Sequence, residues 1–482
     1  MGLLGILVGL GLLIWLSYRG WSVLLLAPAA ALVAAAAAGE PLLAHWTETF
    51  MGGAAKFLAQ FFPLFLLGAL FGKLMDDSGS VETIARFMTD KLGTARAILA
   101  VSLAGAIVTY GGVSLFVAFF VLVPMAQNLF KAADIPHRLV PAAVALGTMT
   151  FTMSALPGTP ALQNAIPMPF FGTTPFAAPG LGVIAAAIML GFGLWWLNRA
   201  EGTARRAGEG YGKHEPVDVA AQEQSARERA TIASEFDPAE IMHGRHAAGA
   251  PSVLVAFLPL IVVILVNLAI SLVVLPRLDT SYLAEARWGE TSLAAVGGVW
   301  AVVVALFTAI LTLIAFNFRR LPSLRESVDA GANASVLPAF SVSSLVGFGA
   351  VIAALPAFAL VRDWVLSIEG GPLVSLAVAT NILAALTGSA SGGLTIALDA
   401  LGETYLRLAS ENGIDPALLH RVAVMSAGTL DSLPHNGAVV TLLAVCGVTH
   451  RDSYKDIFVV AIVGALLALA AVIVLGSIFG SF

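Results

Sequence analysis

Long apolar stretches alternate with short polar connections along most of the chain. Ten of them have the length and composition of a membrane-spanning helix, which needs roughly 20 residues to cross a bilayer. They lie at about residues 3–17, 21–38, 57–73, 138–160, 180–198, 252–276, 291–316, 335–361, 420–447 and 456–479. This pattern predicts an all-α polytopic membrane protein. We interpret its first stretch as a spanning helix rather than a signal peptide, because no positively charged segment precedes it.

Two further apolar stretches, about 97–130 and 371–411, are interrupted in the middle by small residues. One interruption reads Thr109-Tyr110-Gly111-Gly112-Val113-Ser114, and the other reads Thr387-Gly388-Ser389-Ala390-Ser391-Gly392-Gly393. We predict two re-entrant hairpins with their tips at these interruptions. The alternative is that each stretch forms two ordinary spanning helices joined by a tight loop.

Each predicted hairpin precedes a helix that a Leu-Pro pair interrupts, at Pro157 in the first half and at Pro434 in the second. Proline removes a backbone donor, and a broken helix in hydrocarbon is tolerated where it lines a cavity or is buried in protein. An odd number of predicted crossings separates the two units, so we expect inverted repeats with Pro157 and Pro434 close together. Paired broken helices in inverted repeats are typical of secondary transporters.

Residues 199–250 differ from the rest of the chain, because they hold 16 of its 55 charged residues. We interpret them as a hydrophilic linker with a helix over 217–233, between a first repeat at 1–198 and a second at 251–482. With the linker in the cytoplasm and both termini outside, 19 Lys and Arg residues lie inside and 6 outside. Arg421 is among the six placed at the outer side. This asymmetry predicts a bacterial-type cytoplasmic (inner) membrane protein in this orientation.

The composition supports this class, with 58% hydrophobic and 11% charged residues and a mean hydropathy of +0.90. A soluble globule of this size carries about 25% charged residues, so a soluble enzyme is excluded. No basic stretch is dense enough to bind nucleic acid. The one cysteine, Cys446, lies in an apolar run and is expected to be buried.

The tips and breaks should converge on a binding site. Half-helix N-termini, hydroxyls and amides suit an anion such as a carboxylate. No Lys or Arg lies at the tips or breaks, which favours a monocarboxylate held by neutral donors. The candidate substrate-binding residues are Thr109, Gly111, Gly112, Ser114, Ser154, Gly158, Thr159, Asn164, Thr387, Gly388, Ser389, Ser391, Ser432 and Asn436.

Asp431 and His435 flank Pro434 and are the best candidates for proton or cation coupling, because ionisable residues inside a membrane are functional candidates by default. Either could carry the proton. Alternatively, His435 bonds a freed carbonyl and Asp431 caps a half-helix. Their i, i+4 spacing would suit a metal, but no third ligand is evident, so we expect neither a metal nor a cofactor. Asp76 and Asp77, at a helix end, are expected to be solvated.

At these residues the sequence resembles the gluconate:proton symporter (GntP) family of the ion transporter superfamily. The similarity lies in Gly68-Ala69-Leu70-Phe71-Gly72-Lys73-Leu74 with Asp77-Ser78-Gly79, in Val121-Leu122-Val123-Pro124, in Leu156-Pro157-Gly158-Thr159-Pro160 and in Gly388-Ser389-Ala390-Ser391. The resemblance implies a scaffold domain, a mobile transport domain with both hairpins, homodimers, elevator-type alternating access and cation-coupled uptake of an organic acid.

The sequence departs from the gluconate members at the first tip, where they carry an acid and this chain has Tyr110-Gly111-Gly112, and at both breaks. The pattern is similar to members that are permeases for short hydroxy acids such as 3-hydroxybutyrate. We therefore predict proton-coupled symport of a small organic monocarboxylate, 3-hydroxybutyrate or a gluconate-like acid. A sodium-coupled di- or tricarboxylate transporter of the same architecture is the alternative.

A membrane hydrolase and a channel are the rival classes. The sequence has no Gly-x-Ser-x-Gly or His-Glu-x-x-His motif to support a hydrolase, and a channel does not explain why the breaks form an inverted pair. We therefore expect a transporter and no enzymatic activity.

Overall fold

A computed structural model describes residues 2–17, 19, 21–212, 244–247 and 249–482. The described residues form helices and connecting loops, without β-strands. The helix predicted over 217–233 lies outside the described residues. The helices outside the hairpins and breaks are α1 Gly2–Ser17, α2 Val23–Ala38, α3 Leu42–Ala44, α4 Met51–Asp77, α5 Ser80–Leu92, α12 Pro179–Arg206, α15 Val253–Ala269, α16 Leu293–Asn317, α17 Leu324–Ala334, α18 Val336–Ala354, α19 Phe358–Leu366, α24 His450–Ile457 and α25 Gly464–Phe479.

Short π-helical and 3₁₀ segments join or continue these helices. The π-helical segments are His45–Phe50, Ile270–Val274 and Phe458–Val463, and the 3₁₀ segments are Thr94–Arg96, His137–Leu139, Leu275–Arg277, Ser281–Ala284, Ala286–Trp288 and Leu430–Ser432. The first π-helical segment continues into α4, so that one helical rod runs from residue 42 to residue 77.

Helix pairs lie at both predicted hairpins. The first pair is α6 Ala97–Tyr110 and α7 Leu115–Ala132, and the second is α20 Gly371–Thr387 and α21 Ala390–Glu411. The chain reverses at glycines with positive φ, 102° at Gly112 and 63° at Gly388, a conformation that glycine adopts at little cost. A serine caps the returning helix in each pair: Ser114 accepts from the backbone N–H of Phe116, and Ser389 accepts from that of Gly392.

The helix after each hairpin is broken. The first consists of α8 Val140–Thr148, α9 Phe151–Ser154, an irregular segment and the short helices α10 Leu162–Ala165 and α11 Pro167–Phe171. Helical geometry is already lost at Thr150, well before Pro157, where the backbone has φ −111° and ψ −113° and the hydroxyl donates to the Leu146 carbonyl at 2.6 Å. The second consists of α22 Pro416–Thr429 and α23 Gly437–Cys446, with Asn436 capping α23.

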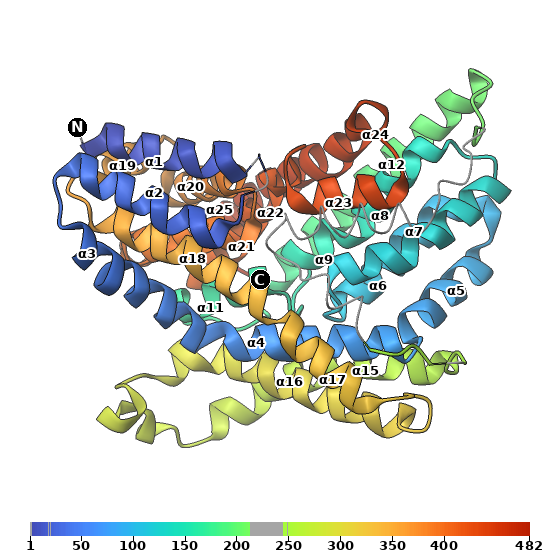
Figure 1. The fold of residues 1–482 in the computed structure, drawn as a ribbon, viewed down its shortest axis with the longest axis horizontal. Coiled ribbons are helices and arrows are strands. Elements are labelled where there is room, and N and C mark those ends of the chain that lie inside the picture. Colours follow the sequence, from blue (N-terminus) through green and yellow to red (C-terminus); the bar gives the residue numbers. More distant parts are fainter. Residues whose placement is uncertain (1, 18, 20, 213–243, 248) are drawn as a thin grey trace.

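At its break, each of these helices passes from one hairpin to the other. Before the breaks, α8 packs on α6 and α7, and α22 packs on α20 and α21. After them, α10 and α11 pack on α21 and α22, while α23 packs on α7 and α8. Figure 1 shows the first hairpin and α8 in cyan beside the orange α21 and α22, with α9 and α23 between them. The breaks therefore tie the two halves of the chain together.

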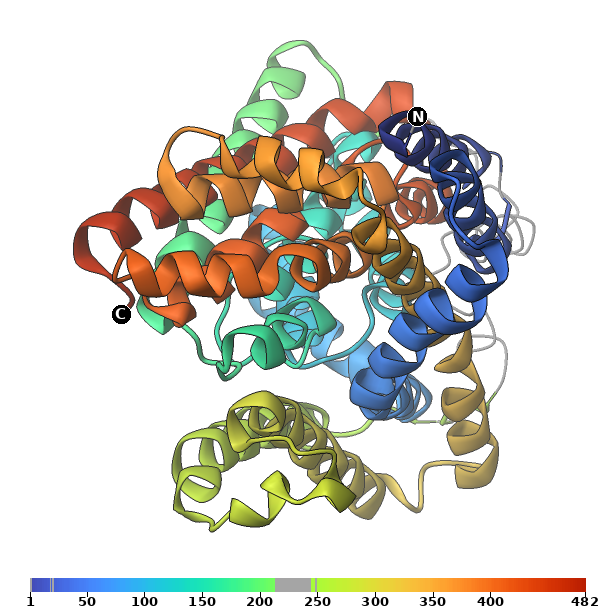
Figure 2. The same ribbon diagram turned by 90° about the vertical axis from the view of Figure 1, so that its left-hand side faces the viewer.

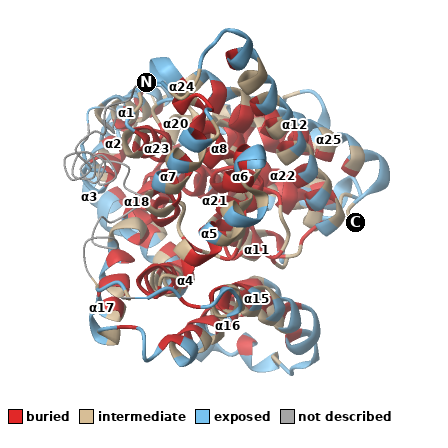
Figure 3. Ribbon diagram, turned by 90° about the vertical axis from the view of Figure 1, so that its right-hand side faces the viewer, coloured by how far each residue is buried: buried red, intermediate tan, exposed pale blue. Residues whose placement is uncertain are grey.

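The remaining helices surround this centre. α4 crosses beneath both hairpins, α1 and α2 pack together beside α18, and α15 and α16 form an outer layer that contacts α4, α5 and α11 (Figures 1 and 2). Buried positions concentrate in the central helices, among them α6, α8 and α22, whereas α15 and α16 expose much of their apolar surface (Figure 3). Cys446 is buried, as expected.

Seven helical segments of the described chain are long and apolar enough to cross a membrane, or eight if α5 and α6, which meet at a 100° bend, form one broken span. This count differs from the ten predicted spans for two reasons. α1 and α2 have 16 residues each, about 24 Å of helix, and the two broken helices are divided into shorter pieces, which removes four of the ten. One of the seven is α7, the second arm of the first predicted hairpin, which was not among the ten. A polytopic membrane protein is therefore supported, and the count of ten stays a prediction.

The predicted linker begins later than expected, because α12 continues to Arg206 with an Arg205–Glu201 ion pair on its exposed face. The end of the predicted linker returns to α4 and to the C-terminal end of α16. There the Ala247 N–H donates to the Asp77 carbonyl at 2.7 Å, and Arg320 donates to the Ala250 carbonyl at 2.6 Å.

Candidate functional site

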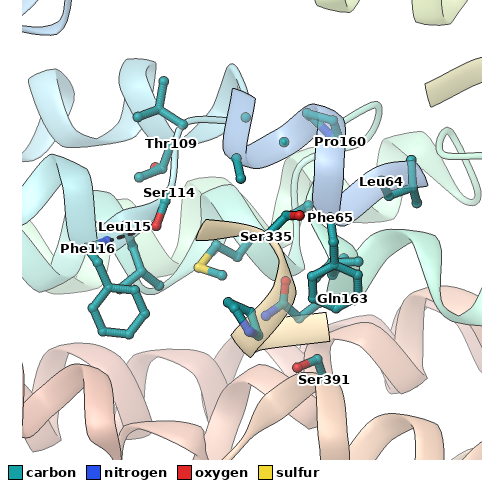
Figure 4. A pocket seen from close by; sticks show the side chains of 18 of the residues that line it. Leu64, Phe65, Thr109, Ser114, Leu115, Phe116, Pro160, Gln163, Ser335 and Ser391 are labelled. Carbon is teal, nitrogen blue, oxygen red and sulfur yellow. Dashed lines mark hydrogen bonds between the residues drawn. The ribbon is translucent and has the colours of Figure 1, made fainter. Parts of the chain in front are cut away.

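A cavity of about 180 Å³ lies where the first tip and the first break meet the outer helices. Its wall comes from α4, the tip between α6 and α7, the segment from Met153 to Gln163, the junction of α17 and α18 at Ser335, and Ser391 at the start of α21. Figure 4 shows Ser114, Gln163, Ser335 and Ser391 around this cavity. Both halves of the chain therefore contribute to one cavity.

The described residues that line the cavity carry no charged side chain. Two long helices begin at its wall: α7 with Ser114 and Leu115, and α21 with Ser391. A helix N-terminus carries unpaired N–H groups and partial positive charge, and both ends here belong to helices of 18 and 22 residues. The arrangement suits a small ligand with one negatively charged end and a polar group.

The first tip is hydrogen-bonded to the first break. The Tyr110 hydroxyl donates to the Pro157 carbonyl at 2.7 Å, and the Thr109 hydroxyl lies 3.3 Å from the Gly147 carbonyl and 3.1 Å from the Thr152 hydroxyl. A Cβ added to Gly112 would lie 2.8 Å from Pro160, so tip and break are in close contact. The first tip and the first break therefore shape this side of the cavity together.

The second tip is joined to the second break in a similar way. The Asn436 amide donates to the Gly388 carbonyl and to Asp431 Oδ1, both at 2.8 Å, while its oxygen accepts from the N–H groups of Ala438 and Val439. His435 Nε2 lies 3.1 Å from the Ala385 carbonyl and therefore donates to it. Asp431 and His435 thus lie at the contact between tip and break.

The structure divides the candidate substrate residues into three groups. Four line the cavity, namely Thr109, Gly112, Ser114 and Ser391. Five others belong to the second tip and second break, which form their own contact: Thr387, Gly388, Ser389, Ser432 and Asn436. The remaining five do not line the cavity and make backbone or packing contacts with neighbouring segments: Gly111, Ser154, Gly158, Thr159 and Asn164. The Ser389 and Ser391 hydroxyls, 3.3 Å apart, connect the first two groups.

Sequence reasoning missed two polar residues of the cavity, Gln163 and Ser335. Gln163 is buried against the cavity and its amide makes no hydrogen bond to another described residue. Ser335 lies at the junction of α17 and α18, where the predicted span 335–361 begins, and α17 itself was not predicted. The sequence feature that could have indicated this junction is the group of small residues before it, Ala330, Gly331 and Ala334.

The tips and breaks have no Lys or Arg of their own, but a cation from α22 contacts the first break. Arg421, which the charge count placed at the outer side, is fully buried on α22 and donates to the Ser154 carbonyl of the first break at 3.3 Å. Its neighbour His420 is also fully buried, with Nδ1 2.6 Å from the Thr173 hydroxyl and Nε2 3.2 Å from Asn164 Oδ1. The carbonyls freed by the first break explain why an arginine is accommodated there.

The expectation that Asp76 and Asp77 are solvated is wrong. They end α4, but both are buried, and Lys73 Nζ lies 2.8 Å from Asp77 Oδ1 and 3.7 Å from Asp76 Oδ2. The segment with His246 covers them, with its Nδ1 3.7 Å from Asp77. The two aspartates and His246 have the spacing of a metal site. The Lys73 ammonium supplies the positive charge that a metal would bring, so we assign no metal here.

Comparison with known proteins identifies the class. Residues 1–170 match the model of the GntP family permeases. The uncharacterized transporter YxjC of Bacillus subtilis (strain 168) is 41% identical over 487 residues, covering 100% of both chains. Among solved structures, MtrF of Neisseria gonorrhoeae, from a class of antimetabolite efflux pumps, has a TM-score of 0.53 at 16% identity, covering 91% of this chain and 85% of its own. The YdaH transporter of Alcanivorax borkumensis has a TM-score of 0.50 at 14% identity, covering 91% and 88%.

The family and the Bacillus subtilis relative point to a transporter, and the apolar helices to a polytopic membrane protein. The two solved structures share the fold alone, since their sequences are too distant to indicate a common substrate. The chain belongs to the GntP family of permeases. The family resemblance seen in the sequence is thereby confirmed.

Proposed function

We propose that this permease is a proton-coupled symporter of a small organic monocarboxylate, with 3-hydroxybutyrate as the best-fitting substrate. The observation that carries the proposal is the cavity of about 180 Å³, whose mainly apolar wall carries four hydroxyl side chains and one amide and is bounded by two helix N-termini. A carboxylate is stabilised by the partial positive charge at the start of α7 and accepts a hydrogen bond from the Ser114 hydroxyl. The substrate hydroxyl then bonds Gln163, Ser335 or Ser391.

The size of the cavity favours a short acid. Benzene, with six carbons, occupies an enclosed apolar cavity of about 150 Å³, so this half-open cavity of about 180 Å³ surrounds about seven non-hydrogen atoms of a ligand. That is the size of 3-hydroxybutyrate, whereas gluconate has nearly twice as many. Citrate and other tricarboxylates carry charges for which the described cavity wall offers no cationic partner, so the cavity does not favour the sodium-coupled alternative.

Coupling is assigned to Asp431 and His435. Asp431 accepts from Asn436, which also holds the Gly388 carbonyl of the second tip. Adding a proton to Asp431 removes a negative charge at the contact between second tip and second break. Because Ser389 of that tip adjoins Ser391 in the cavity wall, a change in this contact reaches the cavity. His435, which donates to Ala385 of the same tip, is the other possible proton carrier.

The transport cycle that we propose uses the two hairpins and broken helices as one mobile unit. Their interlocked packing supports this, because each broken helix is held by both hairpins. The hairpins would be re-entrant, the two halves would be inverted repeats, and α4, α15, α16 and α18 would belong to a dimeric scaffold in the cytoplasmic membrane.

A binding panel tests the substrate assignment. Purified protein is heated with 3-hydroxybutyrate, lactate, gluconate, citrate and succinate, each with and without sodium, and the melting temperature is recorded. A ligand that binds the folded state raises this temperature in proportion to RT ln(1 + [L]/Kd). We expect the largest shift with 3-hydroxybutyrate, independent of sodium. A shift confined to citrate or succinate with sodium would contradict the proposal.

A further inference from the structure

Arg421 has the largest fully buried side chain in the described part of the chain. It projects from α22, the first piece of the second broken helix, toward the first break. Its Nε and Nη2 donate to the Ala177 carbonyl at 3.2 and 2.7 Å, and its Nη1 lies 3.3 Å from the Ser154 carbonyl and 3.5 Å from Asn164 Oδ1. One side chain therefore connects the broken helices of both halves.

All of these partners are neutral. The carbonyl and amide oxygens satisfy the N–H donors of the guanidinium, but none carries a formal negative charge. Among the described residues, no carboxylate lies within 4.0 Å of Arg421, whereas the other buried cation, Lys73, has Asp77 at 2.8 Å. An arginine stays charged in proteins, and an uncompensated buried charge is costly. Charged residues inside membrane segments accordingly tend to mark substrate pathways.

The guanidinium bonds residues that are next along the chain to two residues of the cavity wall. It bonds Ser154 and Asn164, and their chain neighbours Met153 and Gln163 line the cavity. Glycine allows close packing around it: a Cβ added to Gly182 would lie 3.4 Å from Arg421 Nε. In such a tightly packed region charge is weakly screened, so the positive potential of Arg421 extends into the cavity.

We propose that Arg421 is the residue that makes this permease select an anion, without touching the substrate. The inference rests on the proposed function, in which the cavity holds a carboxylate. The substrate supplies the negative charge that the protein itself does not provide, and Arg421 also holds the first break in the position that shapes the cavity. This corrects the view that neutral donors alone hold the anion.

Two substitutions separate the charge from the structural contact. Arg421→Gln removes the charge and keeps an amide donor, while Arg421→Lys keeps the charge and loses the planar fork. The dissociation constants of 3-hydroxybutyrate and of its uncharged methyl ester are measured with each purified protein by thermal-shift titration, and the unliganded melting temperatures report on folding.

We expect Arg421→Gln to weaken 3-hydroxybutyrate binding at least about tenfold and to change ester binding less than about threefold, with Arg421→Lys close to the wild type for the acid. An equal loss for acid and ester in both variants would show a purely structural role and overturn the inference. Unchanged acid binding by Arg421→Gln would overturn it as well. If the wild-type protein binds no acid of the panel, the proposed function fails and this inference fails with it.

Discussion

Asn436 offers a direct test of the contact between the second tip and the second break. Its side chain is 1% exposed and makes four hydrogen bonds, two as donor and two as acceptor. Replacing it with alanine removes the cap of α23 and leaves the Gly388 carbonyl without this donor. Asp431 also loses the amide that donates to it.

The expected loss of stability follows from these contacts. Removing a helix N-cap costs about 1 kcal/mol. Leaving a buried acceptor without its partner costs about 1–3 kcal/mol, so Asn436→Ala should destabilise the protein by about 2–4 kcal/mol. Asn436→Ser should recover much of the capping part, because a serine oxygen also accepts from a helix N-terminus.

The assay is thermal unfolding of the purified protein together with uptake in proteoliposomes. Asn412→Ala is the matched control, because Asn412 is exposed and bonds only within its own helix, to the Leu408 carbonyl at 2.8 Å. We expect Asn436→Ala to lower the melting temperature and the uptake rate, and Asn412→Ala to change neither appreciably. Equal melting temperatures for Asn436→Ala and Asn412→Ala would refute the reasoning.

Three further predictions test other parts of the account. Asp431→Asn should abolish the response of uptake to a pH gradient while substrate exchange across the membrane continues; uptake that still follows the gradient would exclude Asp431 as the proton carrier. Gly68→Leu should block the cavity and weaken 3-hydroxybutyrate binding about tenfold or more. The variant should still fold, because a Cβ at Gly68 meets nothing within 4 Å. Unchanged 3-hydroxybutyrate binding in a titration of this variant would show that the substrate binds elsewhere. Arg138→Gln should lower the free energy of unfolding by about 2–3 kcal/mol, with allowance for the exposure of Arg138, since the buried Asp456 loses its 2.7 Å ion pair. Thermal unfolding should show this loss of stability. Adding Asp456→Asn to the Arg138→Gln protein should make the loss smaller.

The hairpins and breaks could be located from the sequence because small residues and prolines act locally. Glycine and serine determine where α6 and α20 end and where α7 and α21 begin, whatever the rest of the chain does. The predicted ranges 97–130 and 371–411 therefore agree closely with the helix pairs. The early break at Thr150 was not foreseen, because a threonine bonding back to its own helix leaves no distinct pattern.

Buried charge could not be predicted in the same way. Arg421 lies near the beginning of an apolar stretch, where a charge count assigns it to the membrane surface. Only the packing of α22 against the first break shows that free carbonyls surround it. Asp77 ends a helix, which favours solvent, but Lys73 one turn earlier and the end of the predicted linker cover it. Ser335 and Gln163 join the cavity through the three-dimensional arrangement of α4, α10, α17 and α18.

The central claim is tested most directly by uptake of labelled 3-hydroxybutyrate into proteoliposomes containing the purified protein. We predict accumulation above the external concentration when the interior is made alkaline, abolished by a protonophore, unaffected by a sodium gradient and weakly inhibited by excess gluconate. If a sodium gradient drove accumulation of 3-hydroxybutyrate and a proton gradient did not, the result would contradict the account.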